Sequence, residues 1–202
     1  MGSEVLTYLR LGVHHIADLR GYDHILFVAA LTIAYRPGEW RRLLWLVTAF
    51  TLGHSVTLAL ATLDLVRVSS AVVEPAIAAT IVATSLLAFG FAWRAPAGDG
   101  GAGSGPGQAL RYTVAAAFGL IHGLGFSGYL RSLLGDEESL LVPLLSFNVG
   151  LELGQLLIVA VVLGVGVLVE RGLRLSRRGW VLAASAAIAS LGAYVLFERV
   201  AA

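Results

Sequence analysis

Residues 14–24 read His14-His15-Ile16-Ala17-Asp18-Leu19-Arg20-Gly21-Tyr22-Asp23-His24. This stretch places three of the five histidines of the chain, together with two aspartates, at the start of a long apolar sequence. The other two histidines, His54 and His122, each lie inside a further apolar run. Soluble domains seldom place histidines in this way, so the pattern indicates imidazoles and carboxylates gathered inside a membrane.

The composition is that of a membrane protein. Of the 202 residues, 57% are hydrophobic and 13% are charged, whereas about 25% of the residues in soluble domains are charged. The net charge of +1 creates no field that would attract nucleic acid. Cysteine is absent, which excludes thiolate metal sites. We therefore expect the lipid bilayer and a metal ion, and no nucleic acid, as partners; a homo-oligomer is compatible with these data.

Six stretches are apolar over lengths close to the roughly 20 residues that a membrane-spanning helix needs. The predicted fold is an all-α, polytopic membrane helix bundle that forms a single integral membrane domain over residues 1–202. The first span is the least regular, because Gly21–Tyr35 alone is too short to cross a bilayer, and a break is expected at Arg20-Gly21. The six spans are predicted at residues 13–35, 43–65, 71–93, 111–134, 140–169 and 180–197.

The distribution of arginines predicts the orientation. One side of the predicted bundle holds nine arginines and the other holds five. Cytoplasmic loops carry the excess of positive charge, so the nine-arginine side is expected inside and both termini outside.

The intramembrane polar residues share one depth. Counted from the nearest inner arginine, His24, His54 and His122 each lie about 17–18 Å into the membrane at about 1.5 Å per residue. Glu152 lies at a similar level, whereas Glu74 is shallower. A lone histidine in a membrane helix is often a packing residue, but such a concentration of ionisable groups at one level favours a functional site.

Imidazole and carboxylate together are ligands for divalent transition metals such as nickel, cobalt and zinc. On a straight helix His15 and Asp23 would lie about 12 Å apart along the axis, too far to share one ion. Either the helix breaks at Gly21, or His14 and His15 form an outer entry site. The predicted metal ligands are His14, His15, Asp23, His24, His54, His122, Asn148 and Glu152.

Glycine pairs flank two of these residues. Gly119 and Gly123 bracket His122, and Gly150 and Gly154 bracket Glu152. Small residues at this spacing predict close approach of a neighbouring helix.

Five motifs occur together in the chain: His14-His15-Ile16 with Gly21-Tyr22-Asp23-His24-Ile25-Leu26-Phe27, Phe50-Thr51-Leu52-Gly53-His54-Ser55-Val56-Thr57-Leu58, Val73-Glu74, Phe118-Gly119-Leu120-Ile121-His122-Gly123-Leu124-Gly125-Phe126 and Phe147-Asn148-Val149-Gly150-Leu151-Glu152-Leu153-Gly154-Gln155-Leu156. Together they resemble the HupE/UreJ family of bacterial membrane proteins. The resemblance implies a multi-pass protein of the bacterial inner (cytoplasmic) membrane that takes up nickel or cobalt for hydrogenase and urease maturation. It also implies that Asp23 and His24 are important for transport.

Three functions remain open at this point. The favoured one is a metal permease, in which ions enter past His14 and His15. The alternative is an intramembrane metal-dependent hydrolase, with a zinc-type ion held by His24, His54, His122 and a carboxylate. In that enzyme Glu74 or Glu152 would be the general base for a metal-bound water, or Ser55 or Ser127 would instead be the nucleophile. A permease needs polar access from both faces, whereas an enzyme needs a pocket open to one. The third function is a metal sensor or a membrane anchor for a partner. Long soluble loops would favour it, and the sequence has none.

Overall fold

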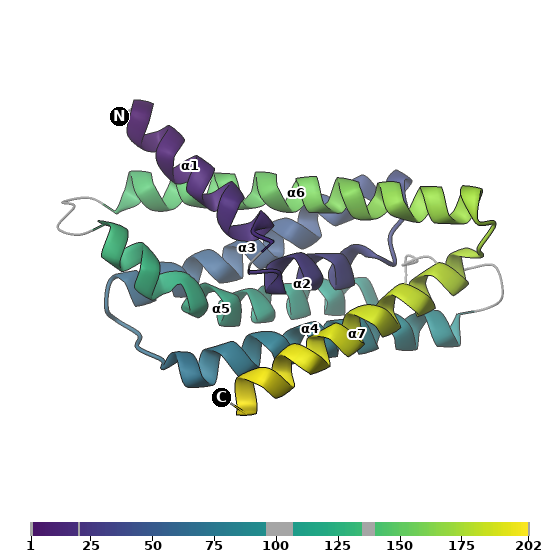
Figure 1. The fold of residues 1–202 in the computed structure, drawn as a ribbon. Helices are drawn as coiled ribbons and strands as arrows, with labels where there is room; N and C mark the ends of the chain where they lie inside the picture. The colour runs from purple at the N-terminus through teal and green to yellow at the C-terminus, as the bar shows by residue number, and fades with distance from the viewer. Residues whose placement is uncertain (1, 20, 96–106, 135–139, 202) are drawn as a thin grey trace.

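The computed structural model describes residues 2–19, 21–95, 107–134 and 140–201. These residues form seven α-helices, one short 3₁₀ helix and no strand, so the all-α prediction is confirmed (Figure 1). The elements are α1 (Gly2–Ala17), α2 (Asp23–Thr32), η1 (Pro37–Glu39), α3 (Trp40–Thr62), α4 (Ser70–Arg94), α5 (Gly107–Leu134), α6 (Leu141–Gly172) and α7 (Arg177–Ala201).

Five of the described helices, α3 to α7, are long and apolar enough to cross a membrane. Helices are the expected form, because the bilayer core offers no water to satisfy free backbone N–H and C=O groups. Both chain termini point toward the same end of the bundle, here called the terminal end (Figure 1). The opposite end, where α4 and α6 end with Arg94 and Arg171 in their last turns, is here called the arginine-rich end.

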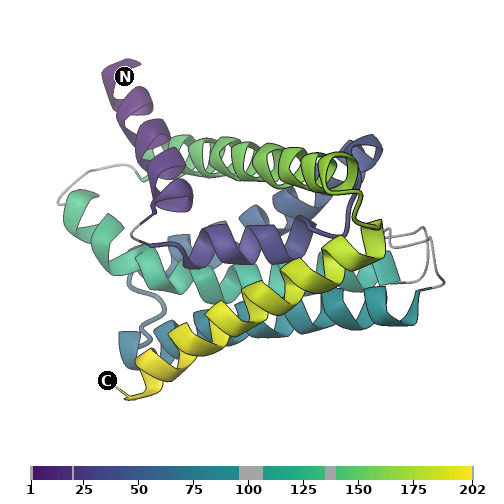
Figure 2. The same ribbon diagram turned by 45° about the vertical axis from the view of Figure 1, so that its right-hand side comes forward.

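The span predicted over residues 13–35 consists of two helices. α1 ends at Ala17, α2 begins at Asp23, and the two helices meet at an angle (Figure 2). α2 has only 10 residues, which at about 1.5 Å per residue covers about half of the hydrocarbon core. The break falls beside Gly21, where glycine weakens a helix by about 1 kcal/mol. Asp23 then stands in the first turn of α2, where the helix dipole favours a negative charge.

The end of α2 that faces the arginine-rich end is held by α7. The nearly buried Arg177 donates hydrogen bonds from Nη2 to the backbone carbonyls of Ile33, at 3.0 Å, and of Tyr35. Its Nη1 pairs with Glu170 at 2.7 Å. Carbonyls at a helix C-terminus lack partners within the helix, so this cation satisfies groups that the bilayer cannot. The short helix α2 is thereby anchored at its C-terminal end.

Glycines let the long helices pack backbone against backbone. The most extensive packing joins α3 with α5, α1 with α6 and α4 with α7. A Cβ atom on Gly119 would lie 2.3 Å from the carbonyl oxygen of Phe50, and one on Gly150 would lie 2.0 Å from that of Leu9. The close helix approach predicted from the glycine pairs is therefore confirmed for both α5 and α6.

Candidate metal site

Four histidines from four helices meet in the bundle. The centroid of the His24 ring on α2 lies 4.6 Å from that of His15 on α1 and 5.0 Å from that of His122 on α5. The ring of His54 on α3 lies 5.8 Å from His15 and 6.2 Å from His24. The structure thus brings together His24, His54 and His122, as their common depth predicted. It adds His15 because the break before α2 folds α1 back toward the cluster. We call these four side chains the histidine cluster.

The imidazole nitrogens of the cluster are mostly without partners. His54 and His122 are fully buried, and His24 is 8% exposed. Among the described residues no hydrogen-bond partner is found for Nε2 of His15 and His24, for either nitrogen of His54, or for Nδ1 of His122. Buried polar atoms in proteins are nearly always hydrogen-bonded, so five orphaned nitrogens in one cluster need an explanation. A cation that accepts their lone pairs would supply it.

The histidine cluster is enclosed by phenylalanines, which sequence reasoning missed. The ring centroid of Phe126 lies 3.9 Å from that of His15, with the two planes tilted by 38°, and the centroid of Phe27 lies 4.7 Å from that of His122. On the side of the arginine-rich end, Phe27 packs against Phe50 at 4.9 Å, and both rings are buried. Phenylalanines are common in all membrane helices, so nothing in the sequence distinguished these. Phe27 and Phe50 make the surroundings of the cluster apolar on the side away from the terminal end.

Asp23 and Glu74 are bound by an arginine that the sequence reasoning also missed. Arg199, close to the C-terminus on α7, pairs through Nη2 with Asp23 at 2.7 Å and through Nη1 with Glu74 at 3.0 Å. A single guanidinium joins α2, α4 and α7, and it satisfies Asp23 without any metal ion. The sequence feature that could have predicted this contact is the position of Arg199 at the end of the last span, on the same side of the bundle as Glu74.

We expect Arg199→Gln and Asp23→Asn to be coupled in their effects on stability. Arg199→Gln leaves the partly buried Asp23 without its cation, and Asp23→Asn leaves Arg199 paired with Glu74 alone, whereas the double variant removes both charges of the Asp23–Arg199 pair. Thermal unfolding in detergent should give a coupling energy of about 0.5–3 kcal/mol. The control cycle replaces Asp23 and Arg67, because Arg67 pairs with Asp64 instead and its side chain is 77% exposed. Additive effects in the Arg199 cycle would contradict the ion pair.

Two polar residues of α6 are hydrogen-bonded to α3. Glu152 accepts a hydrogen bond of 2.5 Å from the hydroxyl of Thr48, and Gln155 accepts one of 3.0 Å from Thr51. Oδ1 of Asn148 is buried and has no partner among the described residues. No group of three or more His, Asp or Glu side chains in the described ranges is arranged to hold a metal ion as it stands. The roles of Glu152 and Asn148 as ligands stay predictions.

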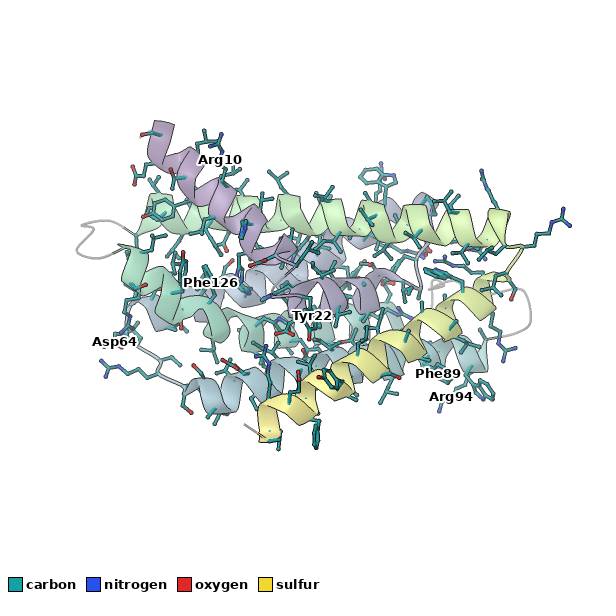
Figure 3. The ribbon with its side chains drawn as sticks, viewed as in Figure 1. Arg10, Tyr22, Asp64, Phe89, Arg94 and Phe126 are labelled. Carbon is teal, nitrogen blue, oxygen red and sulfur yellow. The ribbon has the colours of Figure 1, made fainter. Side chains whose placement is uncertain are left out.

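A cavity of about 400 Å³ leads to the histidine cluster from the terminal end. Phe126 forms part of its wall and is labelled in Figure 3. His14, which is exposed, lines the cavity as well and was predicted as an entry residue. The polar lining comprises His14, His15, Asp18, Asp23, His24, Glu74 and Arg199. The cavity therefore connects the exposed His14 to His15 and His24 of the histidine cluster, whereas His54 and His122 lie behind them and are not part of its lining.

The residues considered for hydrolysis have other partners. Ser55 donates a hydrogen bond of 2.6 Å to the backbone carbonyl of Thr51, the usual packing contact of a serine in a membrane helix. Glu74 is half exposed and is paired with Arg199. Glu152 is engaged with Thr48. None of the three is held against a histidine by a hydrogen bond that the described part of the chain provides.

The sequence of the chain matches a protein family. The family model described as HupE / UreJ protein matches residues 1–199, nearly the whole chain. No curated protein and no solved structure matches the chain.

Proposed function

The chain belongs to the HupE/UreJ family, and on this premise we propose that it is a permease for divalent transition-metal ions of the nickel and cobalt type. The ion would enter the cavity past His14 and His15 and bind at the histidine cluster, with Asp23, Asn148 and Glu152 as further candidate ligands. The observation that carries this proposal is the cavity of about 400 Å³ that reaches His15 and His24, whose Nε2 atoms are buried and have no partner among the described residues.

The ring distances are compatible with a shared ion. A metal–nitrogen bond of about 2.0–2.1 Å places the metal about 3.2 Å from the ring centroid, so two imidazoles on one ion have centroids at most about 6.4 Å apart. The distances from His24 to the other three rings are 4.6, 5.0 and 6.2 Å. The His24 ring is therefore close enough to each of the other three rings to share an ion with it. Nitrogen and oxygen ligands without thiolate suit nickel, cobalt and zinc.

The cavity also has room for a hydrated ion. Six water molecules occupy about 180 Å³ at about 30 Å³ each, less than half of the cavity volume of about 400 Å³. The ion would arrive with its water shell and exchange waters for the imidazoles that line the cavity. Binding must remain weak enough for release, which mixed ligands allow. Release toward the arginine-rich end requires Phe27 and Phe50 to separate.

Proteoliposome uptake tests the proposal. Nickel, cobalt and zinc ions are offered to vesicles that contain the purified protein, and internal metal is measured over time. A metal permease should give saturable uptake of at least one ion and none of magnesium, which requires octahedral oxygen coordination. Empty vesicles are the control. Absence of both uptake and binding for all three metals would overturn the proposal.

A hydrolase remains the second candidate function, because the cavity opens toward the terminal end while buried phenylalanines close the other side. An enzyme needs only one opening. In that function the histidine cluster would hold a zinc-type ion whose bound water is activated. Stoichiometric zinc in a protein that transports no metal would favour this function over the permease.

We expect both termini to face outward in a bacterial inner membrane. In Figure 3 Arg10 and Asp64 lie toward the terminal end and Arg94 toward the opposite end. The chain has no cysteine, so the single variants Gly2→Cys and Arg174→Cys provide clean probes. An impermeant maleimide added to intact cells should label position 2, whereas position 174 should react only after permeabilisation. The reverse pattern would contradict the proposed orientation.

A further inference from the structure

Thr80 is the one described residue that hydrogen-bonds to a ring nitrogen of His122. It lies on α4, is 3% exposed, and places Oγ1 2.8 Å from Nε2 of His122. The same hydroxyl lies 2.7 Å from the backbone carbonyl of Ile77, one turn earlier on α4. His122, Thr80 and Ile77 thus form a short chain of hydrogen bonds at the edge of the histidine cluster.

The donor and the acceptor of each of these hydrogen bonds follow from counting protons. A neutral imidazole has one N–H donor and one lone pair, and a hydroxyl has one proton to donate. If Thr80 donated to Nε2, the ring proton would sit on Nδ1, which is buried and has no acceptor among the described residues. A buried N–H without an acceptor is rare and costly. In the other direction, Nε2–H donates to Thr80 and the Thr80 hydroxyl donates to Ile77, so that every proton has an acceptor.

We propose that Thr80 is a positioning residue: it holds His122 in the Nε2–H tautomer and so reserves the Nδ1 lone pair for a metal ion in the histidine cluster. This inference rests on the proposed metal-binding function. Metal-binding histidines commonly donate their second ring N–H to an oxygen acceptor, which fixes the tautomer and the ring orientation. Here a threonine hydroxyl on a neighbouring helix is that acceptor, and the carbonyl of Ile77 fixes the hydroxyl in turn.

None of the described residues gives the other histidines of the cluster comparable support. Both nitrogens of His54 are unpartnered among the described residues, so its tautomer is free to adapt to the ion. His15 and His24 belong to the helices that meet at the break, whereas His122 lies in the middle of the continuous helix α5. Support from Thr80 therefore makes His122 the best oriented nitrogen donor of the cluster, the one around which the other rings adjust.

Three variants test the inference in the full-length protein. Thr80→Val keeps the shape of the side chain and removes the hydroxyl, whereas Thr80→Ser keeps the hydroxyl. Thr32→Val is the matched control, because Thr32 is buried and its hydroxyl donates to the backbone carbonyl of Val28 on its own helix, with no hydrogen bond to a histidine among the described residues. Nitrogen-15 NMR of histidine-labelled protein reports the tautomer without metal, with the His122 signal assigned by its loss in His122→Gln. Titration with nickel or cobalt ions reports affinity.

In the wild type we expect a protonated Nε2 and an unprotonated Nδ1 at His122. Thr80→Val should lose this preference and bind the metal about 10–100-fold more weakly. Thr80→Ser and Thr32→Val should retain both the tautomer and the affinity. Unchanged affinity in Thr80→Val, with the wild type binding metal, would overturn the positioning role and leave the proposed function standing. A wild type that binds none of the metals would overturn the proposed function itself, even if the NMR signals show the Nε2–H tautomer.

Discussion

His54→Ala should reduce the nickel or cobalt bound to the purified protein from about one ion per chain to a small fraction, and His122→Ala should do the same. The rings of His54 and His122 are fully buried, and the nitrogens that they offer have no other partner among the described residues. Removing one nitrogen donor from a site without thiolates leaves too few ligands to compensate for dehydration of the ion. Elemental analysis after gel filtration measures the loss, and the proteoliposome assay measures uptake.

His14→Ala is the matched control for this prediction. His14 is exposed and lines the cavity that leads to the histidine cluster, but no ring contact joins it to the four histidines of the cluster in the described part of the chain. It should leave bound metal unchanged and lower only the rate of uptake, as expected of an entry residue. A common elution volume in gel filtration shows that each variant is folded. Full metal content in both His54→Ala and His122→Ala would make these histidines packing residues.

Gly53→Ala and Gly119→Ala should each lower the stability of the bundle by about 1–3 kcal/mol or more. The new Cβ atoms would lie 2.1 Å from the carbonyl oxygen of Ala116 and 2.3 Å from that of Phe50. Both contacts are with backbone, so no side-chain rotation relieves them, and α3 and α5 must move apart by about 1 Å to reach normal van der Waals separation. Thermal unfolding in detergent measures the effect.

Gly128→Ala is the control on the same helix. A Cβ atom at Gly128 would meet nothing within 4 Å, and alanine favours a helix over glycine by about 1 kcal/mol. This variant should be as stable as the wild type or more stable. Because α3 and α5 carry His54 and His122, Gly119→Ala should also weaken metal binding, whereas Gly128→Ala should not. Equal stability of the Gly53, Gly119 and Gly128 variants would contradict the close packing of α3 and α5.

The sequence by itself determined the membrane fold and the depth of the polar residues. Apolar runs of about 20 residues indicate membrane-spanning helices directly, because the hydrocarbon core disfavours polar side chains over the whole length of a span. Counting along each helix then placed His24, His54 and His122 at one level, and the structure brings their rings together. Paired glycines predicted close helix packing because only small residues permit it.

Only the tertiary structure decided which polar groups meet. The break before α2 adds His15 to the cluster, Thr48 engages Glu152, and Arg199 reaches Asp23 from 176 residues along the chain. Hydropathy and residue counting give the depth of a side chain, but they do not give the rotation of its helix about the axis or the neighbour that faces it. Those are set by the packing of all helices at once, through contacts between residues far apart in the sequence.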